Sequence, residues 1–208
     1  RSGTSAAMTT SPNMMPTRDV VLVLLVVLAW GSNFTVMKLV LDELPPLLFV
    51  GLRFAILVPL IVLFPRPASW KAIIAIGLLI NAGQFGFLFS AMQADVTAGL
   101  ASLILQSQAP LTILLAAMVF RERVSAIQIA GIALACVGVA GFGVAAGGNV
   151  TVLGLALVLC GALSWACGNL VLRRLPGVNM PALFIWASLV PPLPMLALSI
   201  VLEGPQPI

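Results

Sequence analysis

Histidine is absent from this 208-residue chain, and charged residues make up only 8% of it. Without histidine, the chain can form no Ser–His or Cys–His nucleophile pair and offers no imidazole ligand for zinc. A soluble domain typically carries about 25% charged residues. The scarcity of charge therefore argues against a soluble protein, and the missing histidine argues against several classes of hydrolase.

Carboxylates and cysteines restrict the possible chemistry further. All six Asp and Glu residues lie outside the long apolar segments, so paired carboxylates cannot act within a membrane. The three cysteines lie inside those segments without metal-ligand spacing, and we interpret them as small apolar residues. We expect no catalytic residue, no metal site and no cofactor, because the remaining amides, alcohols and cations suit binding better than catalysis.

Apolar residues dominate what the chain does contain, at 61% of the composition and a mean hydropathy of +1.18. They form seven segments of 19 to 23 residues: Val20–Leu41, Pro46–Phe64, Ala72–Met92, Ala98–Phe120, Ser125–Ala146, Val150–Leu172 and Pro181–Leu202. A helix of that length crosses the roughly 30 Å hydrocarbon core of a bilayer. No segment alternates polar and apolar residues as a barrel strand would. The sequence therefore predicts an all-α integral membrane protein with seven transmembrane helices.

The loops between these segments alternate in charge. Eight basic residues precede the first segment or lie in every second loop: Arg1, Arg18, Arg66, Lys71, Arg121, Arg123, Arg173 and Arg174. The remaining loops carry acidic residues instead: Asp42, Glu43, Asp95 and Glu203. The positive-inside rule then predicts a multi-pass protein of the inner membrane with a cytoplasmic N-terminus. Residues 1–19 are predicted to be a disordered cytoplasmic tail. The net charge of +4 belongs to membrane anchors, so no nucleic-acid partner is expected.

Two cations lie inside apolar segments. Arg53 is placed about 11 Å deep by the rise of a helix, where a charge requires a cavity or a partner. It is therefore a candidate for binding a substrate carboxylate, with the alternative that it reaches outward to Asp42 or Glu43. Lys38 lies near the end of its helix, so reaching the surface is the favoured interpretation there.

Uncharged polar residues form helical stripes in four segments. Amides buried in hydrocarbon need partners, and hydrogen bonds between helices are the alternative to a substrate role. Amides from four helices could together line a polar cavity for a zwitterionic amino acid, with indole faces holding its ammonium group. The expected substrate-binding residues are Trp30, Asn33, Arg53, Gln84, Gln106, Trp165 and Asn169.

Prolines and small residues predict how the helices bend and pack. Pro110 and the cluster around Pro191 should interrupt their helices and free backbone carbonyls. The small residues Gly131, Ala135 and Gly138 form a stripe that predicts close packing of the fifth helix.

An internal repeat links the first and sixth segments. Asn33 and Asn169 both follow a Trp and a Gly, and each is followed five residues later by a basic residue. A proline then follows in both copies, at a constant offset of 136 residues. Because five helices separate the copies, they cross the membrane in opposite directions. Such inverted repeats are typical of transporters that hold substrate near the midplane.

Several strings carry a family resemblance: WGSNF at 30–34, GLRF at 51–54, AGLASL at 98–103, ER at 122–123 and SWACGN at 164–169. With them the chain resembles the EamA-type family of the drug/metabolite transporter superfamily, and it is most similar to the bacterial members that export O-acetylserine and cysteine. The resemblance implies ten helices in two inverted five-helix repeats. It also implies export of small metabolites from the cytoplasm by alternating access, with a proton gradient as the driving force.

The resemblance also divides the chain. Residues 20–146 would form the first EamA repeat and residues 150–208 a truncated second repeat with two of its five helices, so the chain alone is not expected to transport. A seven-helix sensor or receptor is an alternative, although its N-terminus should lie outside. A broader drug-type efflux permease and a membrane enzyme are also compatible with an apolar, multi-pass chain. The oligomeric state is left open.

Overall fold

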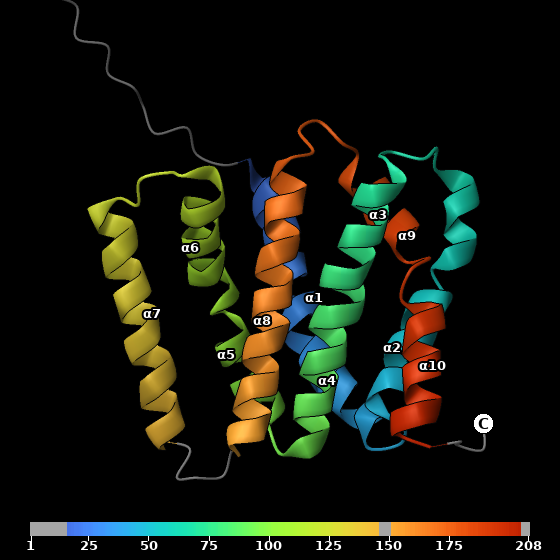
Figure 1. Cartoon of the computed structure of the whole chain (residues 1–208), viewed down its shortest axis with the longest axis horizontal. Coiled ribbons are helices and arrows are strands. Elements are labelled where there is room, and N and C mark those ends of the chain that lie inside the picture. The colour runs from blue at the N-terminus through green and yellow to red at the C-terminus, as the bar shows by residue number, and fades with distance from the viewer. Residues whose placement is uncertain (1–15, 146–150, 205–208) are drawn as a thin grey trace, which may run out of the picture. The chain divides into compact units, whose positions relative to one another are not determined.

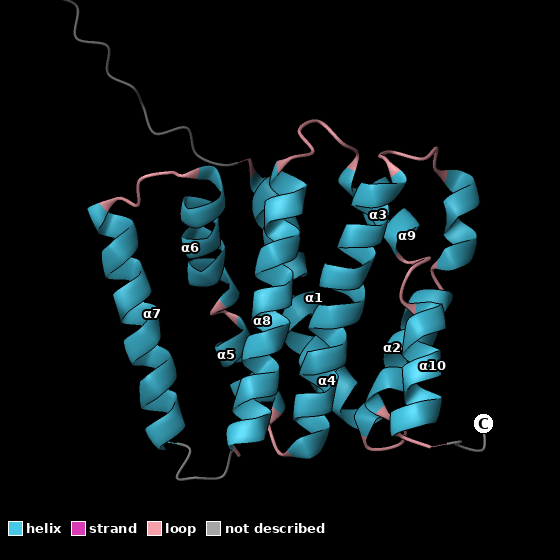
Figure 2. Cartoon of the chain, viewed as in Figure 1, coloured by secondary structure: helices cyan, strands magenta, loops and turns pink. Residues whose placement is uncertain are grey.

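The computed structural model describes residues 16–145 and 151–204, and every regular element in that part of the chain is a helix (Figures 1 and 2). Six of its helical segments are long and apolar enough to cross a membrane: Thr17–Leu41, Pro46–Leu63, Trp70–Ala94, Ala98–Phe120, Val152–Arg173 and Met180–Leu202. The prediction of an all-α, multi-pass membrane protein is therefore confirmed for six of the seven segments.

The remaining predicted segment is helix α7, Ala126–Ala145, whose described apolar part ends at Gly141 and is shorter than a full span. Its crossing of the membrane stays a prediction. The chain divides into two compact units, residues 1–33 and 34–208. The first unit contains most of helix α1, Thr17–Leu41, which begins three residues before the expected start. Residues 1–15 of the predicted tail lie outside the described part of the chain.

Four of the spanning segments are built from more than one helix. The second contains α2 (Pro46–Ala55) and η1 (Val58–Leu63), and the fourth contains α5 (Ala98–Leu105) and α6 (Gln108–Phe120). The last contains α9 (Met180–Ala187) and α10 (Pro192–Leu202). Each of these interruptions lies just before or beside a proline, Pro59, Pro110 or Pro191, because proline lacks the N–H and collides with the preceding turn. The predicted interruptions at Pro110 and Pro191 are thus confirmed.

The third segment changes its winding without a proline. It runs from α3 (Trp70–Ile76) through a π-helix, η2 (Gly77–Gln84), into α4 (Phe85–Ala94). In η2 the carbonyl of Leu79 accepts a hydrogen bond from the hydroxyl of Ser164 at 2.7 Å. A π-helix inside a longer helix is rare and often marks a functional site.

Helix α8, Val152–Arg173, supplies Ser164 and packs against α4, α6 and η2, so it lies between the third and fourth segments (Figure 1). Two of its glycines make this approach possible. A Cβ at Gly168 would lie 2.8 Å from Cδ1 of Ile80, and one at Gly161 would lie 3.1 Å from the carbonyl oxygen of Gln84. Close contact between these helices therefore requires both glycines.

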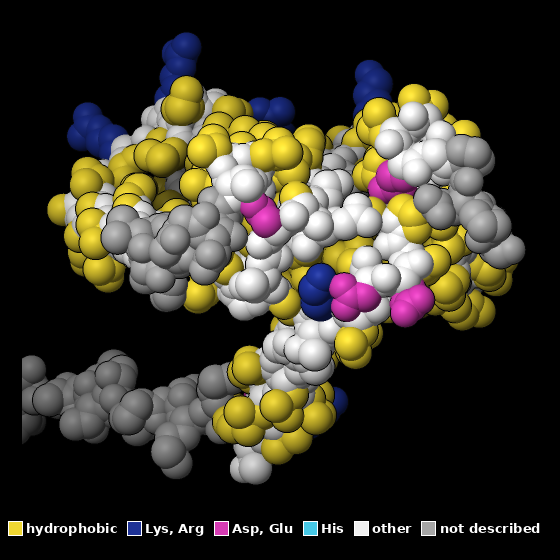
Figure 3. Space-filling view, turned by 90° about the horizontal axis from the view of Figure 1, so that it is seen from below, with side chains coloured by type: hydrophobic (Ala, Val, Ile, Leu, Met, Phe, Trp, Pro, Cys, Tyr) yellow, Lys and Arg dark blue, Asp and Glu magenta, His cyan; other side chains and the backbone are white. Residues whose placement is uncertain are grey.

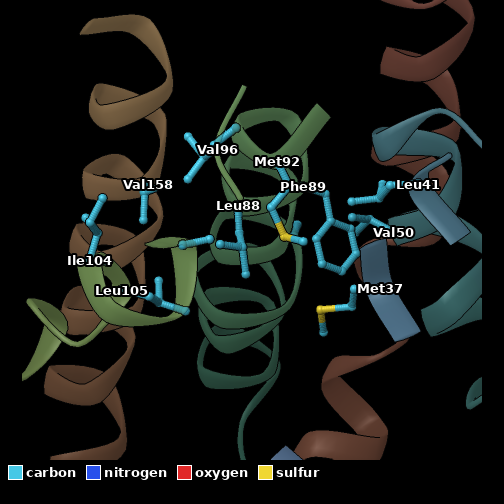
Figure 4. Packing of buried hydrophobic residues seen from close by; sticks show 14 of the residues in the cluster. Met37, Leu41, Val50, Leu88, Phe89, Met92, Val96, Ile104, Leu105 and Val158 are labelled. Atoms are coloured by element: carbon cyan, nitrogen blue, oxygen red, sulfur yellow. The ribbon is translucent and has the colours of Figure 1, made fainter. Parts of the chain in front are cut away.

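The larger apolar core joins α8 to α4, α2 and the end of α1. Figure 4 shows Leu88 and Phe89 of α4 between Val158 on one side and Val50 on the other. The ring of Phe89 stacks on that of Phe49, with centroids 5.1 Å apart. Burial of these side chains holds α2, α4 and α8 together. These helices position the polar residues described below.

The small-residue stripe of α7 does not pack as predicted. A Cβ at Gly131 or Gly138 would meet no atom within 4 Å, so among the described residues neither glycine permits a close helix contact. Glycines that do so lie in α2, η2 and α8. The predicted close packing of α7 through these glycines was therefore wrong. Small residues permit a close helix contact, but the contact forms only where a partner helix lies against them.

Charge separates to the two ends of the second unit. The loops after η1, α6 and α8 carry the basic residues and lie at one end (Figure 1). Figure 3 views the opposite end, where the Asp and Glu side chains gather. Two of these carboxylates cap helices: Glu203 accepts from the backbone N–H of Leu47 at 2.7 Å, and Asp95 accepts from that of Thr151 at 2.6 Å. The N-termini of α2 and α8 are thereby neutralised at the acidic end.

Candidate substrate site

A polar network joins α8 to α6. The amide nitrogen Nδ2 of Asn169 donates to Oε1 of Gln108 and to Oγ1 of Thr112, both at 3.1 Å. The hydroxyl of Thr112 in turn donates to the backbone carbonyl of Gln108 at 2.7 Å. Gln108 begins α6 just after the interruption, and Thr112 follows one turn later on the same face. The interruption therefore sets the position of both acceptors opposite α8.

A pocket of about 180 Å³ opens beside this network, between α6, α8 and the start of α7. Its lining combines apolar residues with amides, one carboxylate and two guanidinium groups: Thr112, Ile113, Ala116, Ala117, Glu122, Arg123, Val124, Gln128, Asn169, Leu170 and Arg173. One ordered water needs about 10–15 Å³ of such space, so the pocket can hold a small polar molecule. It is smaller than the roughly 300–1,000 Å³ typical of sites for drug-sized ligands.

An ion pair stands at the basic end of the pocket. Both guanidinium nitrogens of Arg173 donate to the carboxylate of Glu122, one of them at 2.8 Å. An aromatic ring also holds Arg173 in place, since its guanidinium carbon lies 4.8 Å from the centroid of the Phe120 ring. The neighbouring Arg174 lies over the same ring at 5.2 Å. Planar, two-bond contact of this kind is the strongest geometry available to arginine and carboxylate.

The short loop before α7 places Glu122. Arg121 ends α6 with φ of +54°, in the left-handed region that L-residues other than Asn and Asp seldom adopt. Glu122 follows this turn directly, and its side chain reaches Arg173 of α8. After it, Ser125 and Gln128 form a reciprocal capping box, in which the backbone N–H of each residue donates a hydrogen bond to the side chain of its partner. The loop is thus anchored at both ends.

The contact with Arg173 lowers the pKa of the Glu122 carboxyl below its ordinary value, mainly through the hydrogen bond and then through the charge of the guanidinium. A lowered pKa means that the ion pair is complete above the ordinary carboxyl range near pH 4.3 and is lost only as the pH falls through the lower, folded value. The pair is therefore charged across the physiological range of pH.

The structure brings only some of the expected site residues together. Asn169 lines the pocket, and Trp165 lies one turn before it on α8, partly buried against both apolar clusters. Gln106 lies in the interruption between α5 and α6 and faces a separate hollow of about 150 Å³ beside α7. Gln84 ends the π-helix and is only 2% exposed, so it is enclosed by packed helices.

Arg53 contacts an aromatic ring rather than Asp42 or Glu43, and its role toward a substrate carboxylate stays a prediction. Its guanidinium carbon lies 4.5 Å from the centroid of the Phe85 ring, a cation–π contact between α2 and α4. Asp42 instead pairs with Lys38 at 2.8 Å, which confirms the surface position expected for that lysine. Trp30 and Asn33 belong to the first unit, and their role in the site stays a prediction.

Sequence reasoning did not select for the site three groups that the structure makes prominent. Thr112 and Gln108 complete the network with Asn169, and Glu122 pairs with Arg173. Asn81 of η2 is 3% exposed, and its Nδ2 has no hydrogen-bond partner among the described residues. The ER pair at 122–123 could have predicted the ion pair, because an acidic residue in an otherwise basic loop indicates a basic partner.

Comparison with known proteins supports a transporter. A model of the EamA-like transporter family matches residues 17–144, more than half of the chain. The chain is 43% identical to a protein of Salmonella typhimurium and 42% identical to one of Escherichia coli K12, both named "Probable amino-acid metabolite efflux pump". Each match covers 91% of this chain but 66% of the relative, so the chain spans about two thirds of the length of these relatives.

More distant similarity points the same way. The chain is 32% identical to an uncharacterized transporter of Bacillus subtilis over 76% of its own length and 54% of that protein. No solved structure matches the chain.

Proposed function

Because the chain belongs to the EamA-like transporter family, we propose that it forms part of an inner-membrane exporter of small amino-acid metabolites such as cysteine and O-acetylserine. Export would proceed by alternating access from the cytoplasm, which faces the basic loops. Membership in a transporter family argues against the two alternative functions, a receptor and an enzyme. The names of the two relatives support amino-acid metabolites as the substrate class.

The observation that carries this proposal is the pocket between α6 and α8. It combines a hydrogen-bonded amide network with one carboxylate and two guanidinium groups, so it offers partners for both charges of a zwitterion. Its volume of about 180 Å³ has room for a small metabolite. A drug-type permease is the second candidate, and the names of the two relatives favour amino-acid metabolites over it.

The arrangement of the second and last segments supports the inverted-repeat architecture. Helix α2 packs on α10, and α9 packs on η1, so the first half of each segment contacts the second half of its counterpart. Both segments are interrupted near their middle, at residues 56–57 and 188–191. Two repeats related by an axis in the membrane plane would produce this reciprocal contact, and the remaining helices of a ten-helix protein would complete the cavity.

Efflux measurement tests the proposal. Cells that express the full-length protein, preloaded with radiolabelled cysteine or O-acetylserine, are expected to lose label several times faster than cells with an empty vector. Collapse of the proton gradient with an uncoupler should slow that loss if protons drive export. Label retention equal to that of the empty-vector cells, with the protein present in the membrane, would disprove the proposed substrate class.

Arg53 has a proposed role as a partner for the substrate carboxylate. Arg53→Lys keeps the charge and the contact with Phe85 but loses the two-bond geometry, so export per molecule is expected to fall about tenfold. Arg53→Leu should leave the amount of protein in the membrane unchanged, because leucine suits the bilayer. Wild-type efflux from Arg53→Lys would assign the arginine to packing against Phe85 instead.

A further inference from the structure

We infer that the Glu122–Arg173 ion pair is a gate at the basic mouth of the pocket, opened by the zwitterion that it admits. The inference rests on the proposed export of amino-acid metabolites. The incoming carboxylate would take the two donors of Arg173 while the ammonium takes the oxygens of Glu122. The substrate thus replaces each half of the ion pair with a matching charge of its own.

The position of the pair fits a gate. Glu122 and Arg173 both line the pocket, yet their side chains are about half exposed, at 47% and 50%. They therefore contact the surroundings on one side and the pocket on the opposite side. The same pocket is lined by Asn169, one helical turn before Arg173 on α8, and by Thr112, to which Asn169 is already hydrogen-bonded. The gate and the amide network therefore belong to one pocket.

The cost of opening is small. Ion pairs between exposed side chains contribute little to stability, because water and salt screen them. A zwitterion leaves neither partner unpaired, since it supplies an anion to Arg173 and a cation to Glu122. A plain carboxylate or a plain amine makes only one of these two charge-assisted contacts and leaves the second partner to water. The gate therefore selects zwitterions over singly charged molecules.

Both sides of the open gate remain held in place. The Phe120 ring lies under the guanidinium of Arg173, so arginine keeps one contact when Glu122 leaves. Glu122 sits on a loop fixed by the left-handed turn at Arg121 and by the capping box of Ser125 and Gln128. Only the side chains need to rotate for the pair to open.

Binding to the purified full-length protein tests the gate with three probes. L-cysteine carries both charges, cysteine methyl ester lacks the carboxylate, and 3-mercaptopropionate lacks the ammonium. Competition against radiolabelled L-cysteine should show the wild-type protein preferring cysteine to both analogues by about tenfold or more, the factor expected for one charge-assisted contact. Arg173→Gln should abolish the preference over the methyl ester, and Glu122→Gln the preference over 3-mercaptopropionate.

Arg174→Gln is the matched control, since it removes a charge from the same Phe120 ring without altering the pocket lining. It should keep both preferences. If Arg173→Gln does not fold, Arg173→Lys replaces it and should bind cysteine several times more weakly. Wild-type preferences in the Glu122 and Arg173 variants would overturn the gate while leaving the proposed function intact. Failure of the wild-type protein to bind cysteine would instead overturn the proposed function, and the gate with it.

Discussion

Replacing Gly168 by alanine is expected to reduce the amount of folded protein in the membrane sharply. The new Cβ would lie 2.8 Å from Cδ1 of Ile80 and nearer still to its Cγ1, closer than real side-chain atoms approach. Ile80 is only 5% exposed and β-branched, so it has little freedom to move aside. Overpacking of a core typically costs about 1–3 kcal/mol in the free energy of unfolding. Here the cost should reach the upper part of that range, because the backbones of α8 and η2 must separate.

Thermal unfolding of the purified protein measures this effect, and Gly138→Ala in α7 is the matched control. Both changes add one methyl group to a helical glycine in an apolar segment, but a Cβ at Gly138 meets no atom within 4 Å among the described residues. The control should therefore be neutral or slightly stabilising, since alanine is the better helix former. Equal midpoints for the two variants would mean that α8 and η2 are not in close contact.

Gly168 also illustrates what sequence could and could not predict. The segments themselves were predictable, because length and hydropathy follow from the thickness of the bilayer. The interruptions at Pro110 and Pro191 were predictable because proline acts locally. The partner of α8 was not, since Gly168 lies 88 residues beyond Ile80 in the chain and no local pattern connects them.

A helical stripe requires a regular α-helix, and two of the four segments with polar stripes are not regular throughout. Gln106 would share a face with Ser102 and Pro110 only if their segment wound at 3.6 residues per turn from end to end. The chain breaks at Gln106 and Ser107, so Gln106 faces the hollow beside α7 while Gln108 faces α8. The π-helix departs from that winding as well, because its i→i+5 hydrogen bonds rotate the following residues.

The ion pair was missed for a different reason. Arg173 was interpreted only as an orientation signal, because the positive-inside rule explains a basic loop without requiring a partner. Its contact with Glu122 joins residues 51 positions apart and depends on the turn at Arg121. Asn169, in contrast, does line a pocket, as an amide that needs a polar neighbour in a transmembrane helix should, and its binding of substrate stays a prediction.

Asn169→Leu is expected to reduce efflux of cysteine or O-acetylserine by at least about tenfold per molecule of protein. Leucine removes the donor that Gln108 and Thr112 share, and it leaves two acceptors beside a pocket wall that has become apolar. The variant also lacks an amide to hydrogen-bond a charged group of the substrate, and such a bond contributes about 1.5–3 kcal/mol, which is enough for such a loss in affinity. The amount of protein in the membrane should change by less than about twofold, because leucine is favourable in hydrocarbon.

Two variants separate a binding role from a packing role for Asn169. Asn169→Asp keeps the size and polarity but cannot donate when ionised, so it should lose efflux as leucine does if the donor is what matters. Cys167→Ala changes the same turn of α8 outside the pocket lining and should export normally. Efflux is measured from preloaded cells and divided by the amount of protein in the membrane. If Asn169→Leu lowers that amount while efflux per molecule stays at the wild-type value, the amide network holds α6 to α8 and takes no part in binding substrate.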